Sequence, residues 1–299
     1  MDERTANELA VVVPAFNAAA TIGASLTSVL TQTVACREIV VVDDGSSDET
    51  RQIVLNCPTP VRLVSTQNQG AAAARNRGVA ETSAPLIAFL DADDVWHPDK
   101  LSLQVSALNK NLPAVACSTR FFKIDDYDVQ WRKLHDSEIR VASRELVDIF
   151  RRPYLGTPTV VVRRDAFNAV GGFDTSLRTA EDVDLWLRLA ERGLIITIDA
   201  PLAGVRQLDS GISRSSGQEG DLNNLKVIDR FLSRNPDFAV HHRHLVARMR
   251  HDIRCRVGGG YIGSRRWNEA ATILREAWIE YPLGARAAFL LLKSLLRLS

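Results

Sequence analysis

The sequence feature that most constrains the fold is a series of short apolar runs in the first part of the chain. They occupy residues 9–17, 38–47, 61–66, 85–94 and 114–122. Each run is rich in β-branched residues and continuous rather than alternating, which is typical of a strand covered on both faces. Segments of helical composition lie between them, at 17–32, 47–56, 70–82 and 98–109. This alternation predicts an α/β domain with a mostly parallel, twisted sheet, helices on both faces and right-handed crossovers.

The pattern weakens after the fifth run and then returns. Residues 123–148 are polar and of mixed charge, and they predict a loop that leads into a helix. Strand patterns reappear at 157–167 and 194–202, with a helical pattern at 181–193 between them. The second half of the α/β domain is therefore expected to add further strands to the same sheet.

A Gly- and Ser-rich stretch at 210–220 predicts a domain boundary. Strand patterns are absent from the sequence after it, and residues 217–299 predict about four helices. We expect an α/β domain at 1–215, with halves of about 1–122 and 123–215, followed by a helical region at 216–299.

Composition excludes some classes of partner. Lys and Arg (37) nearly balance Asp and Glu (36), which does not favour nucleic-acid binding. The four cysteines, at 36, 57, 117 and 255, form no C-x-x-C pair, as expected of reduced thiols in the cytoplasm. The first ten residues are polar, and no run reaches the roughly 20 apolar residues of a bilayer span. These features predict a cytoplasmic protein.

The C-terminal region leaves a peripheral membrane contact open. Residues 241–256 are basic, and Arg286, Lys293 and Arg297 fall on one helical face opposite leucines. Such a pattern can attract anionic headgroups at the inner face of a membrane. The alternative is a solvated face on an ordinary packing helix. The sequence does not predict an oligomeric state.

Polar side chains follow three of the predicted strands. In an open parallel sheet, ligands bind beyond the carboxyl ends of the strands, so these residues are expected to share one rim. They are Pro14, Ala15, Phe16 and Asn17 after the first run, Asp43 and Asp44 after the second, and Asp91, Asp93 and Asp94 after the fourth.

The aspartates at 91, 93 and 94 are close enough in sequence to repel one another. A divalent cation would reverse that repulsion, and Mg²⁺ typically takes one or two carboxylates and completes its shell with phosphate oxygens. The pattern therefore suits a nucleoside diphosphate held with a metal. The alternative is a polar turn in which Asp94 or Asp99 stabilises the next helix N-terminus.

The segment "VVDDGSSDET" also allows two interpretations. Ser46 and Glu49 can form a capping box for the helix at 47–56, and the Asp44-Gly45 pair favours a turn. A functional interpretation directs a carboxylate of Asp43 or Asp44 at a donor group such as a pyrimidine imide or a ribose hydroxyl.

Taken in order, the motifs resemble a known family. "VVVPAFN", "VVDDGSSDET", "QGAAAARNRG" and "FLDADD", followed by "GGFD" and "EDVDLWLRLAERG", resemble the family 2 glycosyltransferases of the GT-A (Rossmann-like) fold over roughly residues 8–214. The resemblance implies an inverting enzyme of the hexosyltransferase type that uses a nucleotide-sugar donor, most often UDP-linked, with Mn²⁺ or Mg²⁺. It implies a glycan, a lipid-linked molecule or a protein as the acceptor, in cell-surface polysaccharide biosynthesis.

The resemblance also implies roles for the donor-binding residues. In such enzymes the turn matching Pro14, Ala15 and Phe16 packs on the nucleotide base, and Asp44 accepts a hydrogen bond from it. Arg75 lies close to the nucleotide, and Asn17, Asp43 and Ala92 complete the nucleotide-sugar-binding set.

The remaining roles concern the metal and the chemistry. Asp91 approaches the ribose and is a second candidate metal ligand, while Asp93 coordinates the metal that bridges the two phosphates. The pair Glu181-Asp182 supplies the catalytic carboxylates, with Asp182 as the general base. An ordinary helix start, with Thr179 as N-cap, would explain the same two acids without catalysis.

The sequence departs from the family pattern at one place. Many relatives carry a metal-binding histidine after the last strand, and Leu208 stands there, so Gln207, Asp209 or water would have to substitute. A non-catalytic sugar-nucleotide or glycan-binding module of the same fold is therefore the alternative function. A nucleotidyltransferase is disfavoured because no glycine-rich phosphate loop follows the first strand. A scaffold acting through 217–299 is a further alternative.

Overall fold

The computed structural model describes residues 8–125, 129–134, 139–153, 155–206 and 217–298. The chain divides into two compact units, Met1–Leu208 and Asp209–Ser299, which we call the sheet unit and the helical unit. Leu208, Gln207 and Asp209, which bear on the predicted metal shell, lie outside the described residues.

The sheet unit alternates strands and helices as expected. Its elements are β1 (Leu9–Ala15), α1 (Ile22–Leu30), β2 (Glu38–Asp43), α2 (Thr50–Leu55), β3 (Arg62–Ser65), α3 (Ala71–Ala80), β4 (Leu86–Phe89), β5 (Val95–Trp96), α4 (Lys100–Lys110), β6 (Ala114–Ile124), β7 (Val141–Arg144), α5 (Leu146–Arg151), a 3₁₀ turn (Thr157–Thr159), β8 (Val161–Arg163), α6 (Arg164–Ala169), α7 (Glu181–Ala190) and β9 (Leu194–Arg206).

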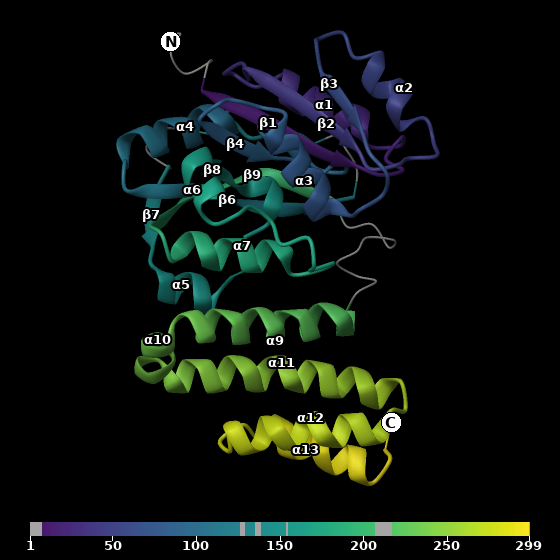
Figure 1. Ribbon diagram of the computed structural model, residues 1–299, viewed down its shortest axis with the longest axis vertical. Coiled ribbons are helices and arrows are strands. Elements are labelled where there is room, and N and C mark those ends of the chain that lie inside the picture. The colour runs from purple at the N-terminus through teal and green to yellow at the C-terminus, as the bar shows by residue number, and fades with distance from the viewer. Residues whose placement is uncertain (1–7, 126–128, 135–138, 154, 207–216, 299) are drawn as a thin grey trace. The chain divides into compact units, whose positions relative to one another are not determined.

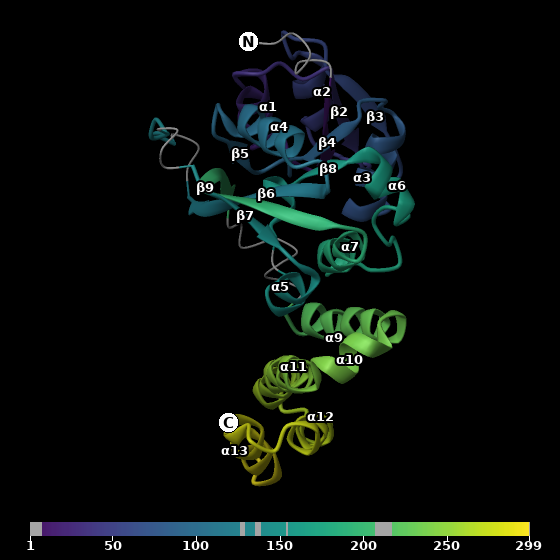
Figure 2. The ribbon, with the colours of Figure 1, turned by 90° about the vertical axis from the view of Figure 1, so that its left-hand side faces the viewer.

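These strands form one sheet in the order β3-β2-β1-β4-β8-β6-β9-β5, with β7 also paired to β9. Figure 1 labels these strands except β5, which is labelled in Figure 2. The strands β3, β2, β1 and β4 are mutually parallel. Beyond β4 the sheet is mixed, because β8 runs antiparallel to both neighbours and β5 and β7 run antiparallel to β9. The predicted α/β architecture is confirmed, and the sheet is uninterruptedly parallel only from β3 to β4, although β6 and β9 also pair in parallel.

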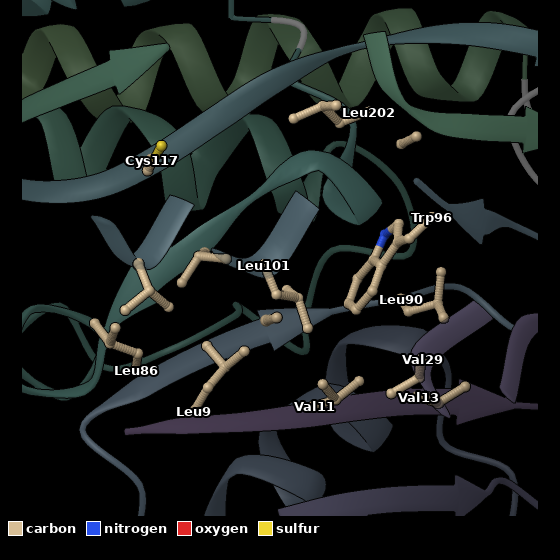
Figure 3. Packing of buried hydrophobic residues seen from close by; sticks show 14 of the residues in the cluster. Leu9, Val11, Val13, Val29, Leu86, Leu90, Trp96, Leu101, Cys117 and Leu202 are labelled. Carbon is tan, nitrogen blue, oxygen red and sulfur yellow. The ribbon is translucent and has the colours of Figure 1, made fainter. Parts of the chain in front are cut away.

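The central strand β1 is buried on both faces, which explains its unbroken apolar run. Leu9, Val11 and Val13 face a core that includes Val29 of α1 and Leu101 of α4 (Figure 3). Figure 2 shows α1 and α4 on one side of the sheet and α3 and α6 on the other.

The helix α3 lies very close to the other face of β1. A Cβ added at Gly78 would lie only 2.3 Å from Cγ1 of Val12, so glycine permits this approach. Since Arg75 lies on the same helix, the close packing of α3 also fixes a residue of the predicted nucleotide-sugar-binding set.

Two predictions about local structure need correction. The segment 123–148 leads into a helix, α5, as predicted, but it also contains the strand β7, whose residues are largely exposed and therefore show no apolar run. The helix α2 begins at Thr50 after Glu49, without a side-chain cap, so Ser46 and Glu49 form no capping box. The hydroxyl of Ser46 instead accepts a hydrogen bond from the backbone N–H of Asn17, at 2.9 Å.

The helical unit contains α9 (Gly217–Arg234), α10 (Pro236–His241), α11 (Arg243–Gly263), α12 (Trp267–Glu280) and α13 (Ala285–Leu295). Its core includes Cys255, Leu274 and Ala287 from three of these helices. Among the described residues, no helix combines the length and the apolar character needed to cross a membrane.

Candidate active site

The predicted rim is present, because β1, β2 and β4 are parallel and end at the same edge of the sheet. Ala15 pairs with Asp43, and β4 ends at Phe89, two residues before Asp91. The residues collected from the sequence therefore lie at the ends of these strands or on the loops that follow them.

The loop after β1 is tied to the loop after β2. Asn17 has a φ of 48°, a left-handed conformation that asparagine tolerates better than most residues. Its side-chain oxygen accepts a hydrogen bond from the N–H of Ser47 at 2.9 Å. Phe16, next to it, is 51% exposed, while Pro14 is half-buried and Ala15 is buried. An exposed ring on a fixed loop is suited to stacking on a flat partner such as a nucleotide base.

Both aspartates after β2 are buried and bonded to protein donors. Asp43 accepts from the guanidinium of Arg51 at 2.5 Å and from the N–H of Ser46 at 3.2 Å. Asp44 accepts from the N–H groups of Gln69 and Gly70, the latter at 2.7 Å. Asp43 thus stabilises the β2 turn and Asp44 fixes the start of α3, while their contact with a nucleotide stays a prediction.

Arg75 links two of the predicted acidic groups. Its Nη2 donates to Asp91 at 2.7 Å, and its Nη1 donates to Glu181 at 3.0 Å. Asp91 follows β4 and lies 16 residues from Arg75 in sequence, while Glu181 is the first residue of α7 and lies 106 residues away. One buried guanidinium therefore joins the donor side of the rim to the candidate catalytic pair.

A second set of contacts holds Arg75 in place. The guanidinium lies over the ring of Phe173, 5.3 Å from its centroid. Asn76 bonds to both backbone groups of Phe173, donating from Nδ2 at 2.8 Å and accepting at Oδ1 at 2.9 Å. The motifs "ARNRG" and "GGFD" are thus adjacent in space. Asn76 and Phe173 lie inside these motifs, but the sequence alone did not predict a role for either residue.

The aspartates after β4 have unusual protonation behaviour. Burial and the neighbouring Asp91 raise the pKa of Asp93 to about 6. Burial, Asp91 and Asp93 raise the pKa of Asp94 well above its ordinary value, although the N–H of Arg206 donates to Asp94 at 2.9 Å. Burial together with the charge of Asp91 therefore disfavours the ionised form of both carboxyls.

The candidate catalytic pair opens α7. The residue before it is Ala180, with a left-handed φ of 63°, and it is the N-cap in place of the predicted Thr179. Such a conformation costs an alanine about 1 kcal/mol or more, and strain of this kind clusters at functional sites. Asp182 is half-buried and accepts from the N–H of Val183 at 2.7 Å.

The pKa of Asp182 is suited to a general base that works near neutral pH. Burial and then the charge of Glu181 raise its pKa to about 7, while the Val183 N–H and Arg75 act in the opposite direction. A carboxylate with a pKa near the working pH is well matched to taking a proton from a hydroxyl.

The carboxylate oxygens at the rim are suitable ligands for a divalent cation of the Mg²⁺ or Mn²⁺ type. Within the part of the chain that the structure describes, no three His, Cys, Asp or Glu side chains are grouped as a metal cage. Mg²⁺ does not require one, because one or two carboxylates suffice when substrate phosphates complete the shell. Asp91 and Asp93, with Ala92 between them in the turn, provide two carboxylates at one strand end.

Comparisons with known proteins agree on one family. Residues 10–171, more than half of the chain, match the family described as Glycosyl transferase family 2. The Escherichia coli protein UDP-Glc:alpha-D-GlcNAc-diphosphoundecaprenol beta-1,3-glucosyltransferase WfgD is 33% identical over 198 residues, which are 64% of this chain and 73% of that protein.

A second relative is longer than this chain. The uncharacterized glycosyltransferase RC0461 of Rickettsia conorii is 28% identical over 201 residues, which are 67% of this chain and 33% of that protein. The match therefore spans about a third of that relative's length.

Solved structures show the same fold. The crystal structure of S. aureus TarS 1-349 has a TM-score of 0.61 at 18% identity, covering 96% of this chain and 90% of that one. Its complex with UDP-GlcNAc has a TM-score of 0.63 at 17% identity, with the same coverage. At this identity the likeness establishes the fold alone. With the family match, the fold and the ordered motifs in agreement, this chain belongs to glycosyl transferase family 2.

Proposed function

We propose that this chain is an inverting, metal-dependent glycosyltransferase that moves a sugar from a UDP-linked donor to a hydroxyl of a lipid-linked glycan. The observation that carries the proposal is the Arg75 bridge between Asp91 and Glu181. It joins Asp91, a strand-end carboxylate suited to the donor, to Glu181, the residue beside the candidate base. The residues proposed for donor binding and for proton transfer are therefore connected through one buried side chain.

The donor class rests on the rim and on the solved relatives. TarS has been crystallised with UDP and with UDP-GlcNAc. In this chain the exposed ring of Phe16 is available for a base, and the fixed loop at Asn17 holds it beside the β2 edge. Asp91 and Asp93 would hold Mn²⁺ or Mg²⁺, which when bound neutralises the diphosphate that leaves.

The chemical step is assigned to Asp182. Its carboxylate would take the proton of the acceptor hydroxyl as the oxygen attacks the anomeric carbon, and the sugar–phosphate bond would break as the new bond forms. We assign no nucleophile to the chain itself, so the displacement is single and inverts the anomeric configuration. Glu181, held by Arg75, keeps the start of α7 in place and raises the pKa of Asp182.

The acceptor class rests on the E. coli relative, whose name specifies a GlcNAc-diphosphoundecaprenol acceptor. By analogy we assign this chain a sugar linked to a lipid diphosphate, in cell-surface polysaccharide assembly at the cytoplasmic face of the membrane.

The test is a transfer assay with a panel of UDP-sugars, Mn²⁺ or Mg²⁺ and a synthetic lipid-diphosphate-linked GlcNAc. We expect released UDP and an inverted product, and loss of both in Asp182→Asn. Asp199→Asn is the matched control, because Asp199 is an exposed aspartate of the same unit that pairs with Arg120 at 3.1 Å. Donor binding without hydrolysis or transfer would instead identify a sugar-nucleotide-binding module.

A further inference from the structure

The helix α13 presents an unusual amount of apolar surface to solvent. Fourteen large apolar side chains are exposed among the described residues, and eight of them lie between Trp278 and Leu298. On α13, Phe289 is 63% exposed and Leu292 is 56% exposed. Phe289, Leu292, Leu295 and Leu296 form what we call the α13 face, since each step along a helix turns by about 100° and brings them to one side.

The opposite side of α13 is already used. Ala287 and Ser294 are buried, and the hydroxyl of Ser294 donates to the backbone oxygen of Trp267 at 2.8 Å. The α13 face is therefore additional to the packing that holds the helix in its unit.

Positive charge borders the α13 face. Arg286 and Lys293 are two turns apart on the helix, and Arg297 follows its end. The segment from Tyr281 to Leu298 contains no Asp or Glu. An apolar stripe beside a basic one is the pattern of a helix that lies in a membrane interface.

The acids of the neighbouring helix do not offset this charge, because they are paired elsewhere. Glu280 of α12 bonds to Arg250 of α11 at 3.0 Å and also to Arg254. Glu276 pairs with Arg254 at 3.4 Å. The side chains left to meet a partner at α13 are thus leucines, a phenylalanine and cations.

We propose that the α13 face docks on an anionic phospholipid bilayer. The leucines and Phe289 would enter the boundary between headgroups and acyl chains, with Arg286 and Lys293 at the level of the phosphates. The helix is only about 16 Å long, so it would lie in the plane of the interface and not cross it.

Charge favours lipid over a second copy of this chain. Two α13 faces packed on each other would bring together the cations of both copies without an acid on the segment to pair them. Anionic headgroups supply the complementary charge. The surface goes beyond the proposed function, and it places the chain where a lipid-linked acceptor would be found.

The experiment is co-sedimentation of the full chain with vesicles of phosphatidylcholine, alone or with phosphatidylglycerol. We expect binding that requires phosphatidylglycerol. The double variant Arg286→Gln with Lys293→Gln should bind about 30-fold more weakly, since each basic residue near an anionic surface contributes roughly fivefold. Phe289→Glu should abolish binding, while Leu112→Glu, which changes an exposed leucine of the sheet unit, should not.

Equal binding to both kinds of vesicle, or no effect of Phe289→Glu, would overturn the proposal. So would self-association that Phe289→Glu abolishes in sedimentation velocity, without vesicle binding. Hydrolysis of a UDP-sugar in solution is measured on the same variants and should be unchanged. A chain that docks but does not hydrolyse the donor would contradict the proposed function and leave the docking surface standing.

Discussion

Replacing Arg75 with methionine removes the side chain that bonds to both Asp91 and Glu181. Methionine keeps most of the volume of the side chain but neither hydrogen bond, so two carboxylates lose their shared cation. The Arg75 side chain is 6% exposed, against 29% for Asp91 and 15% for Glu181. The substitution therefore leaves negative charge in a site that water reaches only in part.

The magnitude follows from that burial. Removing one partner of a buried ion pair typically costs about 3–5 kcal/mol. Because Asp91 keeps some contact with water and can be hydrated in the variant, we expect the lower end, about 3 kcal/mol. For a unit of this size that corresponds to a melting temperature lower by about 6–12 °C. Donor turnover should fall by about 10²-fold, as the carboxylates move from their positions.

The assay is thermal unfolding together with UDP-sugar hydrolysis, and the matched control is Arg77→Met. Arg77 lies on the same helix and pairs with Glu81 at 2.5 Å, but its side chain is 55% exposed, so the expected loss is below about 1 kcal/mol. Arg75→Lys should recover part of the stability, because one ammonium group cannot reproduce the two-pronged geometry. Equal losses in Arg75→Met and Arg77→Met would refute the assignment of a buried bridge.

Three further predictions concern the base, the metal and a motif glycine. The raised pKa of Asp182, about 7, predicts that kcat/KM falls tenfold for each pH unit below 7, because only the ionised form accepts a proton. Asp182→Asn should lower turnover by about 10²–10⁴-fold at pH 8. Mn²⁺ should raise the melting temperature with increasing concentration, and Asp93→Asn should remove that rise, which differential scanning fluorimetry measures. Gly172→Ala should lose about 1–3 kcal/mol more in denaturant unfolding than Gly171→Ala. Both have positive φ, but only at Gly172 would a Cβ meet a neighbour, Oδ1 of Asn76 at 2.7 Å.

The parallel half of the sheet could be predicted because its signal is local. A strand such as β1 is covered on both faces, so burial alone makes its sequence continuously apolar. The strand β7 carries no such signal, since it lies at an edge with exposed side chains and is held by backbone pairing to β9. The two-residue strand β5 is likewise defined by its partner on β9.

The rim residues could be collected from sequence, but their partners could not. Asp44 and the loop before α3 are 26 residues apart, and Asn76 and Phe173 are 97 apart. Pairings over such distances depend on the packed fold, which periodicity does not encode. The capping box predicted from Ser46 and Glu49 is absent for a related reason. The hydroxyl of Ser46 bonds to the backbone of Asn17, in the loop after β1, and does not cap its own helix.

The electrostatic argument about the clustered acids also changes with the structure. A bound cation was expected to be what balances them, yet Arg75 already neutralises part of the charge of Asp91 and Glu181. Burial and Asp91 raise the pKa of Asp93, and burial, Asp91 and Asp93 raise the pKa of Asp94, so the ionised form of both carboxyls is disfavoured. A metal bound at Asp93 would favour the ionised form of that carboxyl, because a cation lowers the pKa of a carboxyl that it binds. The chain thus holds Asp91 through Arg75 without a ligand, whereas the proposed metal would act at Asp93, two residues further along the chain.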